Sequence, residues 1–345
     1  MKKSLLALAA LGTFAGVVSA QSSVTLYGTV DMRGMYVKND GSTRRLSLGT
    51  NGINSSQLGF KGIEDLGGGL KAGFELLADL APIDTGNAAG RFFGRRAVVS
   101  LYSPAGELRL GRDYTPSFWN QTVFDAFGTN GVGNSLNVAQ AYNGTRQDNS
   151  IGYFLPGKIG GLYGQVMVAA GEGGTSGDRP GRYLGARVGF AAGPFNVAVA
   201  AAEQEFGLPF GLNLAGDKQI TYNAGGSYDF GIFKLLGYYQ RDNLERAHED
   251  RFSVSAQVGM GQGQFRVGYD RSKLNRDVGG STTVDQIKAT YQYNLSKRTA
   301  IYGTISRLDN KNATRFGVAG GSSITAAPTA GGESKGFDLG VRHFF

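Results

Sequence analysis

The last ten residues of the chain, 336–345, are Gly-Phe-Asp-Leu-Gly-Val-Arg-His-Phe-Phe. In this stretch Phe337, Leu339 and Val341 alternate with carboxylate, glycine and guanidinium side chains. A period of two places successive side chains on opposite faces of a β-strand, so one face is apolar and the other polar. The stretch therefore predicts a strand that ends the chain on an aromatic residue, Phe345.

The same period of two recurs through most of the chain. It is clear from Val24 to Arg33, from Leu70 to Asp79, from Leu162 to Val168 and from Phe252 to Val258. Alternation by itself fits a soluble β-sandwich with its apolar face inward. It equally fits a membrane barrel with that face outward.

The connections between the alternating segments favour the barrel. The predicted strands are 23–37, 55–65, 69–79, 91–103, 106–112, 146–156, 160–171, 182–192, 194–204, 217–230, 231–243, 250–260, 263–273, 283–295, 298–308 and 335–345. Short links follow the even-numbered strands, and longer links such as 38–54 and 113–145 follow the odd-numbered ones. This alternation is typical of outer-membrane barrels, whose short turns are periplasmic. We predict an all-β fold, a 16-stranded antiparallel transmembrane β-barrel.

The first twenty residues have the pattern of a secretory signal peptide. Lys2 and Lys3 precede an apolar run from Leu5 to Val18, and Val18-Ser19-Ala20 fits the small-x-small cleavage pattern. The run is too short to span a bilayer comfortably, and an N-terminal core helix is the alternative. We expect residues 1–20 to be removed, leaving one barrel domain, 21–345, that is exported.

The composition excludes several kinds of site. The 345 residues include no cysteine, which excludes disulfides, thiolate metal ligands and cysteine nucleophiles. His248 and His343, the two histidines, lie far apart in the sequence. Glycine is abundant at 56 residues, but 21 Phe and 16 Tyr are too many for a disordered chain. We therefore expect an ordered protein with no cofactor and no metal site.

Several segments carry a family resemblance. Residues 58–72 are Leu-Gly-Phe-Lys-Gly-Ile-Glu-Asp-Leu-Gly-Gly-Gly-Leu-Lys-Ala, and residues 111–116 are Gly-Arg-Asp-Tyr-Thr-Pro. With residues 23–28, 294–300 and 340–345, they resemble the Gram-negative general porins, in particular the anion-preferring porins of β-proteobacteria. The resemblance covers the whole mature chain. It implies an outer-membrane homotrimer that passes small hydrophilic solutes and anions, with a third loop folded into the pore.

The longest connection, residues 113–145, is apolar as well as long. Its aromatic side chains include Phe118, Trp119, Phe124 and Phe127. Aromatic side chains on a loop of this length need a surface on which to pack. We predict that this loop, loop 3, folds into the barrel lumen and narrows the pore; an ordinary extracellular loop is the alternative.

We expect a wall of basic residues opposite loop 3. Alternation places Lys61 and Arg96 on the lumen face of their strands, and it places Arg95 outward unless the strand bulges there. The resemblance adds Arg112 and Arg146, at positions where relatives carry pore arginines.

Fixed positive charges in a constriction raise the local anion concentration, so this wall predicts a mild anion preference. Asp113 and Asp125 of loop 3 are expected to face the wall and to create a transverse field. Gln57 stands where relatives commonly have an arginine, which weakens the expected preference. The alternative is that the arginines pair with carboxylates and only hold the loop in place.

Other functions and partners remain to be compared with a passive channel. An outer-membrane hydrolase would need His248 or His343, a channel selective for organic acids or phosphate would show saturable flux, and an adhesin would need larger external loops. The net charge of +8 also suits nucleic acid, but no binding motif accompanies it. We predict no enzyme activity and no nucleic-acid partner. The expected partners are outer-membrane lipid, lipopolysaccharide and the assembly machinery, for which the terminal Phe345 resembles the signal.

Overall fold

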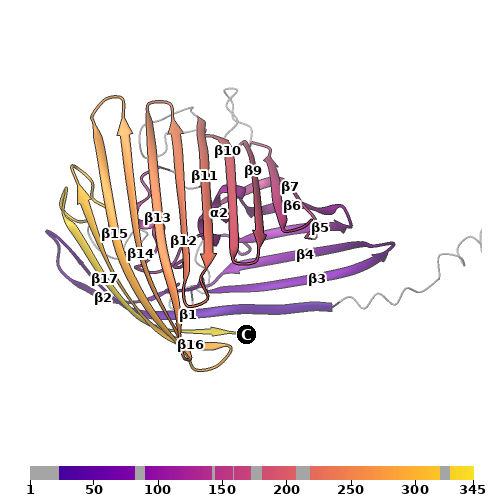
Figure 1. Ribbon diagram of the computed structural model, residues 1–345, viewed down its shortest axis with the longest axis horizontal. Helices are drawn as coiled ribbons and strands as arrows, with labels where there is room; N and C mark the ends of the chain where they lie inside the picture. Colours follow the sequence, from indigo (N-terminus) through magenta and orange to yellow (C-terminus); the bar gives the residue numbers. More distant parts are fainter. Residues whose placement is uncertain are drawn as a thin grey trace, which may run out of the picture.

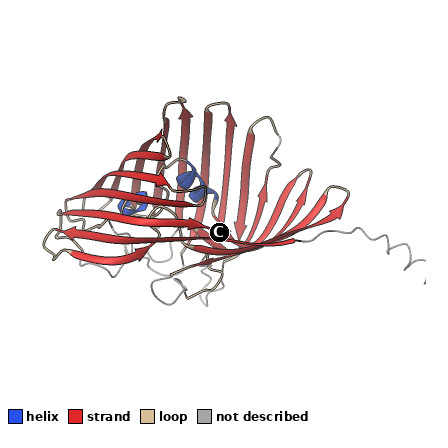
Figure 2. Ribbon diagram, turned by 90° about the horizontal axis from the view of Figure 1, so that it is seen from below, coloured by secondary structure: helices blue, strands red, loops and turns tan. Residues whose placement is uncertain are grey.

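The computed structural model describes residues 23–81, 90–141, 144–157, 159–171, 181–206, 218–318 and 327–345. The predicted signal peptide, residues 1–20, lies outside these residues. Within them the chain forms a wall of antiparallel strands that encloses an α-helix and a 3-10 helix (Figures 1 and 2). In this described part of the chain, no helix is long and apolar enough to cross a bilayer.

The strands follow one another around the wall in the order of the chain. They are β1 (Ser23–Asn39), β2 (Arg45–Thr50), β3 (Gln57–Gly67), β4 (Leu70–Asp79), β5 (Arg96–Ser103), β6 (Gly106–Tyr114), β7 (Arg146–Phe154), β8 (Leu162–Ala169), β9 (Tyr183–Ala192), β10 (Phe195–Glu205), β11 (Lys218–Asp229), β12 (Lys234–Leu244), β13 (Ala247–Met260), β14 (Gly263–Arg276), β15 (Ser281–Asn294), β16 (Thr299–Lys311) and β17 (Glu333–Phe344). Successive strands pair antiparallel, and β1 pairs with β17 to close the barrel.

One strand of the wall is built from two elements. β2 pairs with residues 32–37 of β1, and β3 pairs with residues 23–29. The two elements are therefore successive halves of one wall strand, interrupted at residues 51–56, and the described wall has sixteen strands. The prediction of sixteen is confirmed.

Two predicted boundaries are wrong. Residues 38–54 were expected to be a connection, but they contain β2. Six alternating residues before an Asn-Gly turn signal are too short to indicate a strand by sequence alone. The strand expected from residue 91 begins instead at Arg96, because the backbone turns at residues 90–94.

The interruption in the wall is held by a buried carboxylate, Asp31. Its oxygens accept hydrogen bonds from the backbone N–H groups of Gly52 (3.1 Å), Ile53 (2.9 Å) and Asn54 (2.7 Å), and from the Tyr302 hydroxyl. Several donors on one buried carboxylate compensate its loss of hydration. Asp31 therefore holds this segment inside the barrel.

Solvent exposure decides between the sandwich and the membrane barrel. On β17 the side chains of Phe337, Leu339 and Val341 are 42%, 61% and 48% exposed, whereas Asp338 and Arg342 on the other face are buried. Apolar residues outside and polar residues inside are the reverse of the pattern in a water-soluble sheet. The fold is thus a barrel of the transmembrane type.

The C-terminal residue completes the closure. The backbone N–H and C=O groups of Phe345 and Gly28 exchange two hydrogen bonds of 3.1 Å. A Cβ on Gly28 would lie 2.4 Å from the Phe345 ring, so only glycine leaves room for the ring at this position. The role of Phe345 as an assembly signal stays a prediction.

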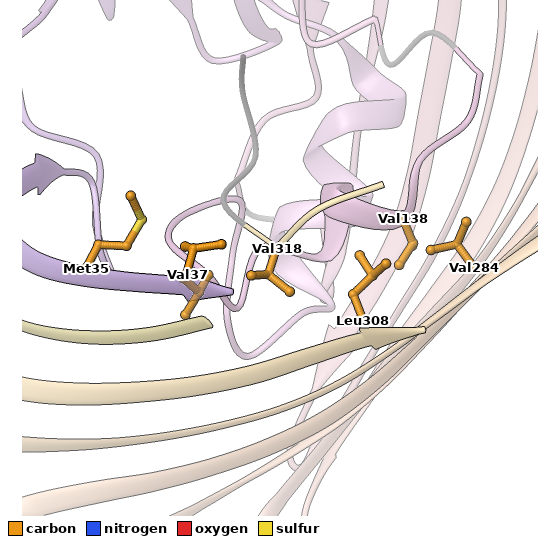
Figure 3. Close-up of a cluster of buried hydrophobic side chains, with 7 residues drawn as sticks. Met35, Val37, Val138, Val284, Leu308 and Val318 are labelled. Carbon is orange, nitrogen blue, oxygen red and sulfur yellow. The ribbon is translucent and has the colours of Figure 1, made fainter. Parts of the chain in front are cut away.

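The largest cluster of buried apolar side chains lies inside the barrel (Figure 3). It joins β1, β15 and β16 to loop 3 and to the connection between β16 and β17. Its members are Met35, Val37, Val132, Val138, Val284, Leu308 and Val318. The lumen is therefore partly filled by loops that pack on the wall.

Candidate functional site: the lumen and its constriction

Loop 3 begins with a short helix, α2 (Pro116–Val123). Thr115 caps it, because its Oγ1 accepts the Phe118 N–H at 3.3 Å and donates to the Gly144 carbonyl at 2.5 Å. Proline suits the first helical turn, where its missing N–H would have no partner. The cap and Pro116 together fix the point at which the chain turns inward.

The helix packs on the inner face of β8–β11. Phe124 is fully buried against Ala198 and Tyr238, and a Cβ on Gly225 would lie 2.2 Å from its ring. Phe118 and Phe127 are also buried, as the sequence predicted for packing residues. Trp119 differs, because it is only half-buried and lines the lumen against the Tyr114 ring at 5.6 Å.

Buried carboxylates of the wall hold the rest of loop 3. Glu249 of β13 accepts the N–H groups of Gln140 (2.9 Å) and Ala141 (2.7 Å). Asp338 of β17 accepts the Val132 N–H at 3.0 Å. These tethers confirm the prediction that loop 3 folds into the lumen.

The open part of the lumen is a cavity of about 900 Å³ between loop 3 and the wall. Its lining includes the inward segment 51–56, through Asn51, Ile53, Asn54 and Ser55. Ser55 Oγ also donates to Asn130 Oδ1 of loop 3 at 2.9 Å. Two inward-folded segments therefore narrow the channel and contact one another.

The charges that line this cavity are unequal. The basic lining residues in the described part of the chain are Arg95, Arg96, Arg146, Lys234, Arg266 and Arg342. The acidic ones are Glu75 and Asp125. The lining therefore carries a clear excess of positive charge.

Arg96 contributes little to that excess. Its guanidinium contacts Glu75 Oε2 at 2.7 Å and Asp113 Oδ1 at 2.6 Å, and Arg109 contacts Asp113 Oδ2 at 2.5 Å. Glu107 pairs with Arg109 in turn. This cluster holds two arginines and three carboxylates, so it braces the wall without a net positive charge.

Four other basic residues keep their charge uncompensated. Arg146 donates to the Tyr114 hydroxyl at 3.1 Å and lies 4.6 Å above the Tyr114 ring. Arg266 donates to two glutamine carbonyls, and Arg342 donates to Asn54. Lys234 is the fourth. Among the described residues, none of these four has a carboxylate within 4.0 Å, so they are the lining residues of this cavity that carry positive charge without a direct ion pair.

Two residues of the expected basic wall do not line the constriction, and one of them, Arg112, faces outward. Lys61 lies on the lumen face of β3, opposite Glu75, but it is exposed at the edge of the cavity, with its ammonium 5.2 Å from the ring of the lining residue Tyr27. Arg112 alternates with the lumen-facing Asp113 and binds Asp148 Oδ1 at 2.8 Å and the Gly94 carbonyl at 2.7 Å. It lies on the outward side of β6 with two exposed leucines. Strand alternation predicts this outward position, whereas the family resemblance implied a position in the pore.

The two carboxylates expected on loop 3 take different positions, because Asp113 is a residue of strand β6 and only Asp125 lies on the loop. Asp113 pairs directly with Arg96, as described above. Asp125 lies across the lumen, 3.6 Å from the Lys288 ammonium of β15, and accepts the Phe127 N–H at 3.0 Å. The structure therefore does not bring Asp113 and Asp125 together opposite one row of arginines.

The sequence analysis did not predict four of the basic residues that line the cavity. Arg95 was expected to point outward, but it lines the lumen and pairs with Asp79 at 2.5 Å, because regular alternation begins only at Arg96. Lys234, Arg266 and Arg342 were not proposed, although each alternates with exposed apolar neighbours. Strand parity would have found these three.

No group of three or more metal-binding side chains occurs in the described ranges. His248 and His343 lie on different strands, next to Asn275 and Thr299 respectively. What distinguishes the interior of this barrel is a polar passage, a folded-in loop and an excess of basic side chains.

Known proteins share this arrangement. A family model described as Gram-negative porin matches residues 7–313. The chain belongs to the Gram-negative porin family. Outer membrane porin protein 32 of Delftia acidovorans is 39% identical to this porin, with 100% of both chains covered. An anion-selective porin from Comamonas acidovorans superposes with a TM-score of 0.82 at 34% identity, over 94% of this chain and 100% of that one.

A more distant structure shares the fold alone. OmpT of Vibrio cholerae, in its trimer form, has a TM-score of 0.70 at 14% identity, over 94% of this chain and 99% of that one. The family and the fold together establish that this porin is an outer-membrane channel. Its relatives are channels rather than enzymes.

Proposed function

We propose that this porin passes small hydrophilic solutes by passive diffusion, with a mild preference for anions. The observation that carries the preference is the set of four lining cations without carboxylate partners: Arg146, Lys234, Arg266 and Arg342. Fixed charges in a narrow passage with low-dielectric walls attract the opposite ion and lower its entry barrier. The anion selectivity of the Comamonas relative supports the same sign.

Neutralising Arg146 is expected to weaken chloride preference, whereas neutralising Arg112 is not. At an effective dielectric constant of about 20, a unit charge ~8 Å away contributes about 2 kcal/mol before salt screening. We therefore expect Arg146→Gln to lower the chloride-to-potassium permeability ratio by roughly threefold. The measurement is the zero-current potential of the purified protein in a planar bilayer across a tenfold potassium chloride gradient.

Arg112→Gln is the matched control, since it removes the same charge from the outward face of β6. Its potential should equal that of the wild type. Equal shifts in the two variants would mean that total charge, and not the lining, sets selectivity. A cation-favouring wild-type potential would overturn the proposed preference.

A channel selective for organic acids or phosphate is the second candidate. The same four cations favour it, because they would bind multivalent anions more strongly than chloride. We propose no catalytic role for His248 or His343. His343 shares the outward side of β17 with exposed apolar residues, and His248 lies 3.8 Å from Asp250 on the outward side of β13.

We also propose a homotrimer. On β12–β17 the outward face carries a band of ion pairs near the long loops, some between neighbouring strands and some along one strand. Its members are Arg241, Asp250, Arg271, Asp285, Arg307, Asp309, Lys311, Glu333 and Lys335. On β2, by contrast, Leu46 and Leu48 are 79% and 69% exposed. A sector whose outward face exposes leucines and has few charges fits a second copy of the chain, whereas the charged band fits lipid headgroups.

Leu48→Asp is expected to dissociate the trimer into folded monomers, because an unpaired carboxylate at a dry interface costs several kcal/mol. Thr283→Asp places the same group in the charged band, between Lys273 and Lys311, and should leave the trimer intact. The measurement is the trimer-to-monomer ratio on unheated detergent gels. Dissociation by both substitutions, or by neither, would contradict this interface.

Three further proposals complete the function. Residues 1–20 are a signal peptide that directs export, and residues 21–345 are the porin domain. The charged band on β12–β17 contacts lipopolysaccharide headgroups. The closing strand with Phe345 is the segment that the outer-membrane assembly machinery recognises.

A further inference from the structure

We propose that Lys234, Gln257, Arg266 and Arg342 form a binding subsite for small doubly charged oxyanions on the periplasmic side of loop 3. The inference rests on the proposed anion channel and names a ligand class for one part of it. All four side chains line the same cavity.

Three of the four groups occupy one row of the wall. Gln257 of β13 is the register partner of both Lys234 on β12 and Arg266 on β14. Side chains in such a row share a face, and neighbouring strands lie ~4.8 Å apart. The backbone positions of Lys234 and Arg266 are therefore about 10 Å apart with an amide between them. A phosphate-sized ion can accept from all three.

The guanidinium of Arg266 is oriented but not neutralised. Its Nε donates to Gln264 Oε1 at 2.8 Å, and its Nη2 donates to Gln292 Oε1 at 2.9 Å. Both acceptors are neutral amides, so the full positive charge remains. Its Nη1 has no bond to either amide and remains available to an anion.

Arg342 supplies the fourth group from β17. Its side chain is 8% exposed; Nη1 donates to Asn54 Oδ1 at 3.2 Å, and the guanidinium lies 4.2 Å from the Phe344 ring. Its buried Nε has no hydrogen-bond partner among the described residues. A buried donor without a partner is costly unless a ligand or water satisfies it. We therefore expect the free Nε of Arg342 to donate a hydrogen bond to a bound anion.

The position of these residues separates this subsite from the constriction. Lys234 follows the short turn at residues 230–233, Arg266 follows the turn at 261–262, and Arg342 lies near the end of the chain. Short turns mark the periplasmic end of such barrels. Arg146, beside Tyr114 at the start of loop 3, lies further from that end. An anion that passes loop 3 meets this second group of cations before it leaves.

The test is the effect of inorganic phosphate on single-channel conductance in potassium chloride. At about pH 8 phosphate is mainly the dianion. In the wild type we expect conductance to fall with phosphate concentration and to saturate, because a bound dianion obstructs chloride. Arg266→Gln and Lys234→Gln are each expected to raise the half-saturating concentration roughly fivefold or more. Conductance steps in chloride alone show that each variant has folded.

Arg271→Gln is the matched control, because Arg271 lies on the same strand but faces outward, paired with Asp285 at 2.6 Å. It should keep the wild-type half-saturation. Wild-type saturation in both lumen variants, or a conductance that falls without saturating, would overturn the subsite. The zero-current potential in chloride is measured separately, so loss of anion preference with phosphate saturation intact would overturn the proposed function and support the subsite.

Discussion

Glu249→Gln is expected to release the outer end of loop 3 and to make the channel both noisier and more conductive. In the wild type the two carboxylate oxygens accept the Gln140 and Ala141 N–H groups, and Oε1 also accepts the Ser272 hydroxyl at 2.7 Å. An amide in place of the carboxylate turns an –NH₂ group toward one of these donors. It also removes a charge 3.6 Å from the buried Arg251.

Arg251 keeps Asp242 as a partner at 2.9 Å, so the substitution leaves unsatisfied donors and does not strand a buried charge, at a cost of about 1–3 kcal/mol. We therefore expect a lower unfolding temperature together with higher single-channel conductance and more open-channel noise. Asp309→Asn is the control, since its pair with Arg307 is exposed on the outward face, away from loop 3, and contributes little. Unchanged conductance in Glu249→Gln, with the protein folded, would show that the other tethers of loop 3 suffice.

Gly111→Ala is expected to destabilise the barrel and to disturb the base of loop 3. Gly111 has a φ of +128°, and a Cβ there would lie 2.1 Å from the Ala97 carbonyl oxygen. The positive φ and the contact with the carbonyl oxygen both involve backbone atoms, so no side-chain movement relieves them. The strain alone costs about 1–3 kcal/mol. Because Gly111 adjoins an irregularity in the β6–β7 register, relief of the strain would move Asp113 away from Arg96 and Arg109.

Urea unfolding in detergent measures the loss of stability, and the chloride potential reports the displaced Asp113. Gly303→Ala is the matched control, because a Cβ there meets nothing closer than 3.7 Å and the backbone is ordinary strand. Equal stability of the two variants would contradict the strain argument.

Much of the fold could be predicted from local pattern. Alternation depends on the fixed period of a strand, so it located nearly every wall strand, and loop lengths indicated which end of each strand carries long connections. The sequence did not predict β2, because this strand depends on pairing with residues 32–37 of β1 and on the hydrogen bonds that Asp31 accepts from the turn that follows it. Neither contact is local in sequence.

The site was predicted less completely. Arg96 and Arg146 do line the lumen, but Arg96 is neutralised by Glu75 and Asp113, whose approach depends on three strands meeting. Parity alone would have placed Arg112 outward and Arg266 inward. The family resemblance instead implied that Arg112 lies in the pore, and no motif or resemblance singled out Arg266.

The sequence by itself determined the barrel: which faces are apolar, how many strands the wall has, and that loop 3 needs a surface. Each of these follows from the period of a strand or from the cost of exposing aromatic side chains to water. Only the tertiary structure decided which charges act in the channel. The field of a cation depends on whether a carboxylate lies within a few ångströms. The carboxylate partners of Arg96 and the amide partners of Arg266 and Arg342 come from strands and segments far apart in the chain.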